Sequence, residues 1–104
     1  MPRAGEGFAE AVLSVVDAIP PGRVMTYGDI AAALGSRGAR AVGQVMAHSG
    51  GSVPWWRVIR AGGRPPAGKA ELARPHYDAE GVPLRAADDE DGYRIDLAAC
   101  RWSG

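Results

Sequence analysis

Apolar residues recur at helical spacing in the first part of the chain. The spacing predicts an amphipathic helix over residues 5–19, because positions three and four apart share one face of a helix. Its apolar face consists of Phe8, Ala11, Val12, Val15, Val16 and Ile19. Pro20-Pro21-Gly22 ends this helix, since proline cannot continue one. Residues 23–25 then form a short extended link.

Two shorter helices follow. Thr26 stands three residues before Asp29, a spacing typical of a capping box, and Gly35 ends the helix that this box begins. Ser36 can cap the next helix, predicted over residues 37–47. The residues that we expect this helix to bury are Ala39, Val42, Val45 and Met46. Two short helices joined by a tight Gly-Ser turn indicate a helix-turn-helix.

The opposite face of the second helix is nearly bare. Arg40, Gly43, Gln44 and Ala47 fall at helical spacing, and a face meant only for water more often carries lysine and glutamate. Glycine and alanine let a backbone come close to another surface. We therefore expect this face to approach a partner in a narrow groove.

The rest of the chain has weaker signals. Residues 53–60 run into a Gly/Pro-rich turn over 62–68, and a helix is predicted over 71–80, begun or interrupted by Pro75 and closed by Gly81. Residues 93–96 resemble a short strand, and 97–102 a final turn. The pattern indicates one domain over 1–104 of the α/β class, mainly α, with a helix-turn-helix and a small β-ribbon.

Charge is unevenly distributed although the net charge is +0. Acidic residues lie near the start (Glu6, Glu10, Asp17) and in the block 88–91. Every charged residue between Ile30 and Ala70 is basic: Arg37, Arg40, Arg57, Arg60, Arg64 and Lys69. A basic middle third can present a positive face to phosphates, or its arginines can simply solvate the surface. Charge alone leaves both interpretations open.

The composition excludes several kinds of site and segment. Cys100 is the single cysteine, so an internal disulfide and a multi-cysteine zinc site are excluded. His48 and His76 lack metal-like spacing to other ligands and are expected at the surface; we expect no metal and no cofactor. The N-terminal residues lack the apolar stretch of a signal peptide, and no run is long enough to span a membrane. We expect a monomeric, cytoplasmic protein, associated with the nucleoid if bacterial.

Three ordered motifs carry a resemblance. They are Pro20-x-Gly22-x-Val24-x-Thr26-Tyr27-Gly28-Asp29-Ile30-Ala31, Ala39-Arg40-Ala41-Val42-Gly43 and Pro54-Trp55-Trp56-Arg57-Val58-Ile59, followed later by Ala79-Glu80-Gly81-Val82. In this order the chain, over residues 8–102, resembles the C-terminal domain of the O6-alkylguanine-DNA alkyltransferases. The resemblance implies the winged-helix-like fold of that domain, with the second helix docked in the minor groove of DNA.

The chain differs from that family at the positions that carry out alkyl transfer. The family motif reads Pro-Cys-His-Arg-Val, and here Trp55 stands at the cysteine and Trp56 at the histidine. The family's glutamate that orients the histidine is expected at Arg74. A thiolate activated by a base is needed for alkyl transfer, and indole supplies neither, so we expect no enzyme activity. Tryptophan at the cysteine position resembles the alkyltransferase-like proteins, which bind alkylated guanine and pass it to nucleotide excision repair.

The resemblance implies a role for individual residues. Arg40 matches the arginine that fills the base stack when a nucleotide flips out, and Tyr27 the tyrosine that rotates the phosphate. Arg57 is expected to tie the loop that carries Pro54-Trp55-Trp56-Arg57, called the motif loop below, to neighbouring backbone. The expected DNA contacts are Thr26, Tyr27, Arg37, Ala39, Arg40, Gly43 and Gln44. The expected lesion pocket is Tyr27, Pro54, Trp55, Trp56, Val58 and Arg64. The partners implied are double-stranded DNA containing O6-alkylguanine and nucleotide excision repair proteins, without a membrane.

Three other functions remain open on sequence alone. An ordinary helix-turn-helix transcriptional regulator without lesion specificity would read bases with polar side chains, of which the second helix offers chiefly Gln44. An enzyme could use Cys100 as the alkyl acceptor. A module for protein interaction would not bind DNA even at low salt.

Overall fold

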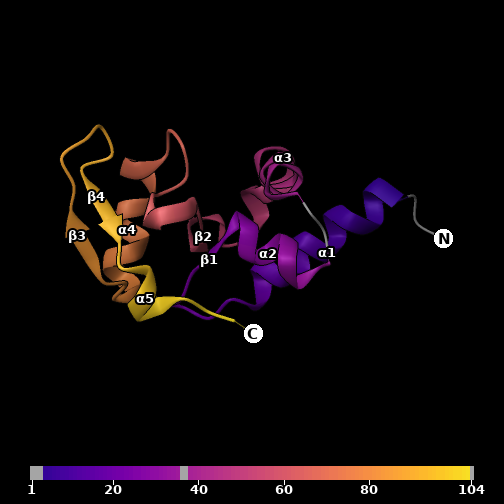
Figure 1. Cartoon of the computed structure of the whole chain (residues 1–104), viewed down its shortest axis with the longest axis horizontal. Helices are drawn as coiled ribbons and strands as arrows, with labels where there is room; N and C mark the ends of the chain where they lie inside the picture. The colour runs from indigo at the N-terminus through magenta and orange to yellow at the C-terminus, as the bar shows by residue number, and fades with distance from the viewer. Residues whose placement is uncertain (1–3, 36–37, 104) are drawn as a thin grey trace.

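A computed structural model describes residues 4–35 and 38–103. Its helices are α1 (Ala4–Ala18), α2 (Tyr27–Ala33), α3 (Ala39–Ser49), α4 (Ala70–Glu80) and α5 (Leu97–Cys100), and its strands are β1 (Met25–Thr26), β2 (Val58–Ile59), β3 (Leu84–Ala86) and β4 (Tyr93–Ile95). Short 3-10 turns cover Gly50–Ser52, Trp55–Arg57 and Ala61–Gly63. The helices α1, α2 and α3 gather at one end of the molecule and the β3–β4 hairpin at the other (Figure 1). A mainly helical chain with small sheets is therefore confirmed.

The predicted capping box begins α2. The Asp29 N–H donates to Thr26 Oγ1 at 3.0 Å, and the Thr26 N–H donates back to Asp29 Oδ2 at 3.1 Å. The helix-turn-helix forms where α2 packs on α3. The predicted cap Ser36 and the first predicted residue of the second helix, Arg37, lie outside the described residues. Gly38 is the N-cap of α3. Ala39, expected in the core, is exposed, because it occupies the first turn of α3 ahead of the buried Val42.

A pair of two-residue strands joins the two halves of the core. β1 runs parallel to β2, with Met25 opposite Val58 and Thr26 opposite Ile59. Successive residues of a strand point to opposite faces. Met25 and Val58 therefore lie in a cluster with α1, α2 and α3, while Ile59 joins a second cluster with α4 and β4. Parallel strands need a long crossover between them, here the whole of α2, α3 and the motif loop.

Helix α4 passes through Pro75 rather than beginning there. It starts at Ala70 and ends at Gly81, whose φ of +70° is the left-handed conformation expected of a glycine C-cap. Ala73 and Tyr77, one helical turn apart, are buried on the second cluster. This packing offsets the hydrogen bond that proline removes from the helix.

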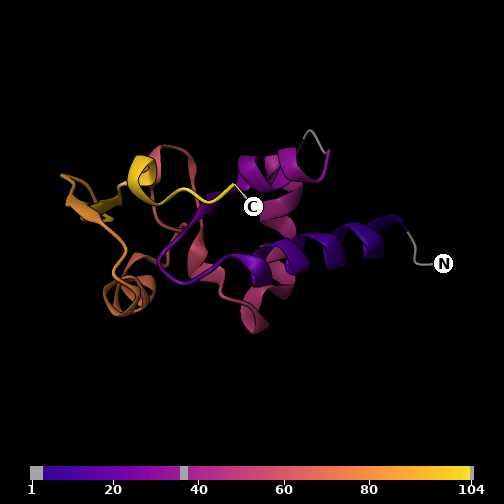
Figure 2. The same cartoon turned by 90° about the horizontal axis from the view of Figure 1, so that it is seen from below.

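The hairpin contains one strand that the sequence did not reveal. β4 was predicted, and β3 pairs with it antiparallel, with Arg85 opposite Arg94. The segment Leu84-Arg85-Ala86 alternates apolar and polar residues, but three residues are too few to mark a strand. After α5 the chain turns back towards the helical end (Figure 2), where the Trp102 N–H donates to the Val24 carbonyl at 2.8 Å.

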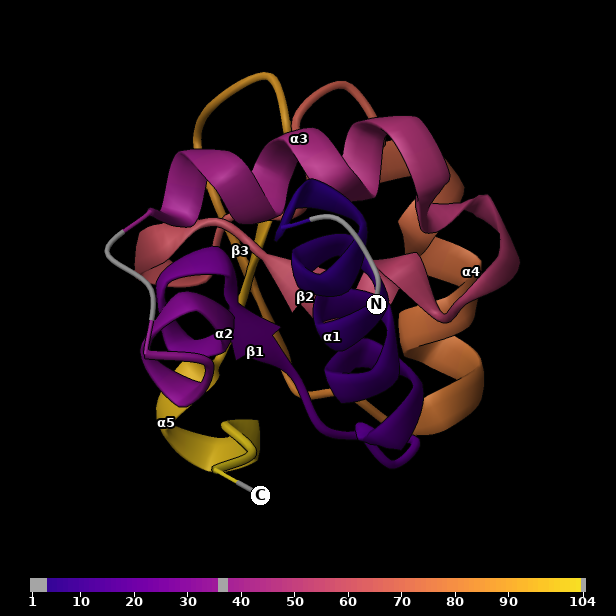
Figure 3. The ribbon, with the colours of Figure 1, turned by 90° about the vertical axis from the view of Figure 1, so that its right-hand side faces the viewer.

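The view from the helical end shows how the elements surround α3. Helix α3 lies across one side of the molecule, with α1 and α2 beneath it (Figure 3). The loop between β2 and α4 and the turn between β3 and β4 extend to this same side, as Figure 1 also shows. Within the part of the chain that the structure describes, no helix is long and apolar enough to cross a membrane.

Candidate nucleic-acid interface

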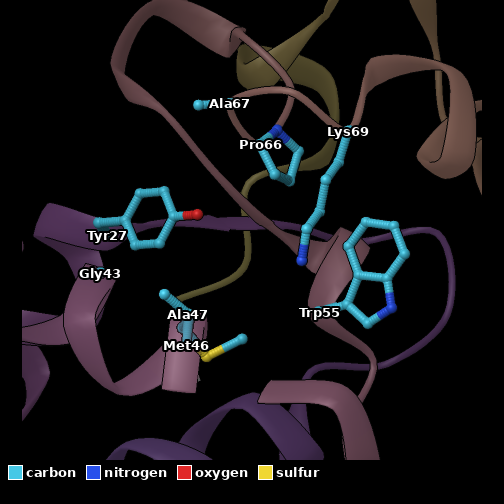
Figure 4. A pocket seen from close by; sticks show the side chains of 8 residues that line it. All are labelled: Tyr27, Gly43, Met46, Ala47, Trp55, Pro66, Ala67 and Lys69. Atoms are coloured by element: carbon cyan, nitrogen blue, oxygen red, sulfur yellow. The ribbon is translucent and has the colours of Figure 1, made fainter. Parts of the chain in front are cut away.

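A cavity of about 210 Å³ opens between α2, α3, the motif loop and the segment that follows β2. We name residues 60–69 of that segment the rim loop. Figure 4 shows the side chains that surround the cavity. They are Tyr27 from α2, Gly43, Met46 and Ala47 from α3, Trp55 from the motif loop, and Pro66, Ala67 and Lys69 from the rim loop. The cavity thus lies directly against the bare face of α3.

Trp55 forms one wall of the cavity. Its indole meets the Trp56 ring edge-on, with centroids 5.7 Å apart and planes at 86°, and it meets His76 similarly at 5.8 Å. On its open side the Lys69 ammonium lies 5.1 Å from the indole centroid, within the range of a cation–π contact. The cavity therefore combines an aromatic wall with one positive charge.

Trp56, which was expected in the pocket, is not among the residues that line the cavity and packs edge-on against Trp55. Its ring stacks on His76 with a centroid distance of 3.7 Å and an interplanar angle of 9°. Its backbone carbonyl accepts a 2.6 Å hydrogen bond from the Tyr77 hydroxyl. His76, expected at the surface, is partly buried, and its ring packs on Trp56.

The Glu80 carboxylate binds both Trp56 and Arg57. Its carboxylate accepts from Trp56 Nε1 at 2.9 Å, from Arg57 Nε at 3.0 Å and Nη2 at 2.7 Å, and from the Gly22 N–H at 3.1 Å. Burial by itself raises the pKa of Glu80, but these hydrogen bonds, led by that from Arg57, outweigh it and hold the pKa below its ordinary value. Arg57 Nη1 also donates to the Ile19 carbonyl at 2.9 Å, as expected of a residue that ties the motif loop to backbone.

The assignment of Arg74 to the orienting position needs correction. Arg74 is exposed on α4 and pairs with Asp78 at 3.0 Å. Glu80 is the acidic residue that contacts the side chain of residue 56. Six residues separate the two positions, about 1.7 turns of an α-helix, so the two side chains lie on different faces of α4.

The bare face of α3 is exposed as predicted. Arg40, Gln44 and Ala47 are exposed on this face, and Gly43 and Ala47 line the cavity. A Cβ atom built on Gly43 would meet no atom within 4 Å. Packing within the protein therefore does not require glycine here, and the missing side chain instead leaves room outside the helix.

Thr26 and Tyr27 adjoin this face at the start of α2. Thr26 is 6% exposed and its hydroxyl oxygen is occupied by the cap, so its clearest role is to begin α2. Tyr27 is half-buried and lines the cavity. Burial raises the pKa of Tyr27, and the nearby Arg60 charge only partly opposes it, so the phenol keeps its proton and can donate.

Other predicted pocket residues lie elsewhere. Val58 is fully buried in the first core cluster, because strand β2 turns it inward against Met25. Pro54 and Arg64 are not among the cavity-lining residues. Arg64 instead reaches Asp91, with Nη2 at 3.5 Å from the carboxylate. Of the predicted pocket set, the structure brings Tyr27 and Trp55 to the cavity.

The basic middle third is largely neutralised by the fold. Arg57 pairs with Glu80, and Arg60 and Arg64 with Asp91. These acids come from the end of α4 and the hairpin turn, which the linear charge pattern separates from the arginines. Arg40 is exposed on α3, and Lys69 is at the cavity. Positive charge towards a partner is therefore focused on fewer positions than the sequence suggests.

Sequence reasoning missed several lining residues. Met46 was assigned to the core, which it also joins, and Ala47 was noted only as part of the bare face. Pro66 and Ala67 carried no pocket signal, because nothing local tells which side of a Gly/Pro-rich loop faces a cavity. Lys69, as the cation nearest the end of that loop, was the one usable hint.

The structure also bears on two other kinds of site. Cys100 is buried, and its thiol lies 3.3 Å from the Asp96 carbonyl. Burial, with the Asp96 charge, raises the pKa of Cys100 despite the nearby Arg23, so the thiol is a poor nucleophile.

Among the described residues, no group of three or more His, Cys, Asp or Glu side chains could hold a metal ion.

Comparisons with known proteins agree with this geometry. The DNA base-flipping protein of Escherichia coli (strain K12) is 37% identical over 103 residues, which cover 94% of this chain and 76% of that protein. Alkyltransferase-like protein 1 of Schizosaccharomyces pombe is 33% identical over 102 residues, or 91% of this chain and 94% of that protein. The crystal structure of S. pombe Atl1 with damaged DNA containing O6-carboxymethylguanine superposes with a TM-score of 0.79, at 33% identity and 98% coverage of both chains.

The family match covers most of the chain. The model of the 6-O-methylguanine DNA methyltransferase DNA-binding domain matches residues 7–82, from α1 through the helix-turn-helix and the motif loop to the end of α4. Every element that lines the cavity falls inside this range. By sequence and by fold, the chain belongs to the family of the 6-O-methylguanine DNA methyltransferase DNA-binding domain.

Proposed function

We propose that this protein is a non-enzymatic sensor of O6-alkylated guanine in double-stranded DNA. It binds the minor groove through α3, rotates a guanine out of the duplex into the cavity beside Trp55, and marks the lesion for nucleotide excision repair. The observation that carries the proposal is the position of the cavity, which opens beside the bare face of α3 and is walled by Trp55.

The size and lining of the cavity suit one base. Its volume of about 210 Å³ is below the roughly 300–1,000 Å³ typical of pockets for drug-sized ligands. Flipped bases are held by stacking on aromatic or apolar side chains. Trp55, Met46 and Pro66 provide such surfaces, and an alkyl group on the guanine O6 gains apolar contacts that plain guanine lacks.

Extracting a base costs a few kcal/mol, so something must take its place in the stack. Arg40, exposed on the bare face of α3, is the residue we assign to this role. Tyr27, with its protonated hydroxyl at the cavity, crowds and donates to the phosphate of the flipped nucleotide. Ala39, Gly43 and Gln44 let α3 approach the groove, and backbone N–H groups at the start of that helix contact phosphates.

Lys69 replaces Arg64 as the residue proposed to contact the adduct. Its ammonium faces the cavity beside Trp55, whereas Arg64 is engaged with Asp91. No acidic side chain is among the cavity-lining residues of the described chain. The pocket therefore favours an adduct with a negative charge, such as O6-carboxymethylguanine, over a neutral one of similar size.

Alkyl transfer is not expected of this chain. Trp55 and Trp56 occupy the positions of the nucleophile and the base, and Glu80 is bound to Trp56 and Arg57. Cys100 is buried with a raised pKa. A protein that holds a lesion without repairing it must pass it on, which is the reason for proposing excision repair proteins as partners.

Intrinsic tryptophan fluorescence tests the recognition step. The protein is titrated with two matched duplexes, one containing guanine and one O6-methylguanine, at several salt concentrations. We expect selective quenching and tighter binding with the lesion, and, for ~4 neutralised phosphates, a log–log salt slope near −3.6 with either duplex. Equal affinity and equal quenching would instead indicate a helix-turn-helix DNA binder without lesion specificity.

The link to repair needs a separate test. A duplex with a single O6-methylguanine is incubated in an excision-competent bacterial extract, with and without added protein. We expect the protein to increase dual incision around the lesion and to leave incision of an undamaged duplex unchanged. An unchanged or reduced incision rate would leave lesion binding intact but remove the proposed hand-over.

A further inference from the structure

The β3–β4 hairpin braces the rim loop at both of its ends. Near the start of the loop, a Cβ atom on Gly63 would lie 2.3 Å from the Ile95 carbonyl oxygen, so the loop backbone rests directly on β4. Beyond the end of the loop, the Tyr93 hydroxyl donates to the Ala70 carbonyl at 2.5 Å. The loop that lines the cavity is thus held against a hairpin that does not line it.

Asp91, in the turn of this hairpin, makes the third contact. Its side chain is 7% exposed and lies among three arginines. Arg60 Nη2 is 3.0 Å and Arg64 Nη2 is 3.5 Å from Oδ2, and Arg94 Nη1 is 4.0 Å away. Arg94 also pairs with Asp89. One carboxylate therefore holds two arginines of the rim loop close together despite their like charge.

Arg60 links Asp91 to the backbone of the rim loop. Its Nε donates to the Pro65 carbonyl at 2.7 Å, and its N–H donates to the Arg64 carbonyl at 2.8 Å. Pro65 is followed directly by the cavity-lining Pro66, whose carbonyl accepts the Lys69 N–H at 3.0 Å. A continuous set of contacts joins Asp91 to the rim side of the cavity without Asp91 touching it.

We propose that Asp91 is a positioning residue for lesion recognition: by clamping Arg60 and Arg64, it holds the rim loop in the shape that lets Pro66 and Lys69 close on a flipped base. The proposal rests on the proposed function of the cavity. Nothing in it requires Asp91 to contact DNA. Its removal alters discrimination between lesion and plain guanine, while general attraction to DNA responds only to the change in net charge.

Asp91→Asn is compared with Asp88→Asn, which removes the same charge from an exposed position on the same turn. Both variants are expected to bind plain duplex equally well or slightly better, because repulsion of phosphates is reduced. Only Asp91→Asn is expected to lower the ratio of lesion to plain affinity, by about fivefold or more, and Asp91→Glu to restore part of it. A ratio that is the same in Asp91→Asn and Asp88→Asn would overturn the proposal.

Hydrogen exchange of the DNA-free protein gives a readout that does not depend on lesion binding. The Arg60 and Lys69 amides are expected to exchange faster in Asp91→Asn than in wild type or Asp88→Asn, while core amides such as Val42 stay protected. If Asp91→Asn does not fold, Arg60→Gln breaks the same contact from the loop side and is expected to show the same two effects. If the wild-type protein bound lesion and plain duplex with equal affinity, the proposed function itself would be refuted. If the wild type preferred the lesion but the variants kept both its affinity ratio and its amide exchange rates, only the role of Asp91 would be refuted.

Discussion

The indole nitrogen of Trp56 donates a 2.9 Å hydrogen bond to the Glu80 carboxylate, which also binds Arg57 through two further hydrogen bonds. In this arrangement the carboxylate orients an aromatic ring that has no acid–base function at neutral pH. The same ring stacks on His76 and backs Trp55. A polar framework suited to orient a base thus serves here to fix the aromatic wall of a cavity.

Glu80→Gln is expected to destabilise the fold at neutral pH. The Arg57 and Glu80 side chains are 13% and 12% exposed, so the loss of one charge leaves the other poorly solvated, at a cost of about 3 kcal/mol. Urea unfolding at pH 7 measures this cost. Asp78→Asn, which breaks the exposed pair with Arg74, is the matched control and is expected to cost under about 1 kcal/mol.

The same pair makes stability depend on pH. Because the folded pKa of Glu80 lies below its ordinary value of 4.5, the folded state binds fewer protons than the unfolded state as the medium becomes acidic. The contribution of Glu80 is complete above about pH 4.5 and is lost as the pH falls through the folded pKa. Glu80→Gln is expected to flatten this acid limb. An equally steep decline in wild type and variant would assign the limb to other carboxylates.

Trp55→Cys alone is not expected to give methyl transfer. The new thiol would still face Trp56, which cannot accept its proton. Trp55→Cys combined with Trp56→His supplies a base on the residue that Glu80 already contacts, and slow transfer of labelled methyl from O6-methylguanine DNA to the protein is expected. Transfer by the single variant would contradict this account of the site; its absence from both would show that the framework around residue 56 cannot orient an imidazole.

Arg40→Ala is expected to weaken binding to an O6-methylguanine duplex by about tenfold, the effect of 1.4 kcal/mol, and binding to plain duplex by less. The difference arises because Arg40 acts when the base leaves the stack, and plain guanine is rarely held outside it. Arg74→Ala removes an exposed arginine from α4, outside the cavity and α3, and serves as the control. Equal losses of affinity for both duplexes would mean that Arg40 contacts phosphate and does not fill the base stack.

Two substitutions of Gly43 distinguish what DNA binding requires from what folding requires. Since a Cβ atom there meets nothing within 4 Å, Gly43→Ala is expected to raise stability by up to ~1 kcal/mol, the usual gain over glycine inside a helix. Gly43→Leu is expected to fold but to lose most DNA binding, because its side chain stands where the groove must approach. Thermal unfolding and duplex titration measure the two effects. A destabilised Gly43→Ala would mean that packing requires glycine here.

Lys69→Met retains the apolar stem of the side chain and removes its charge. Binding to an O6-carboxymethylguanine duplex is expected to fall about tenfold more than binding to an O6-methylguanine duplex. The physical reason is that the Lys69 ammonium faces the cavity beside Trp55, where a carboxylate adduct would lie. Lys69→Arg, which keeps the charge, is the control. A parallel loss on both duplexes would leave Lys69 with a general electrostatic role.

Patterns within single segments predicted the elements that depend on local chemistry. The helical spacing before Pro20, the Thr26–Asp29 capping box and the Gly81 C-cap each involve residues within a few positions of one another, and the structure confirms them. The bare face of α3 was likewise readable, because side chains three and four apart must share a helix face. Tyr27 and Trp55 were assigned to a pocket by motif, and both line the cavity.

Contacts between distant segments were decided by the tertiary structure alone. The sequence shows a basic middle third, but Glu80 and Asp91 are brought to Arg57, Arg60 and Arg64 only when α4 and the hairpin pack against β2 and the residues on either side of it. Nor does any local pattern reveal that Lys69 faces the cavity or that Val58 is turned inward. Charge pairing and cavity lining depend on which surfaces meet in three dimensions, and a linear pattern carries that information only for neighbours on the same element.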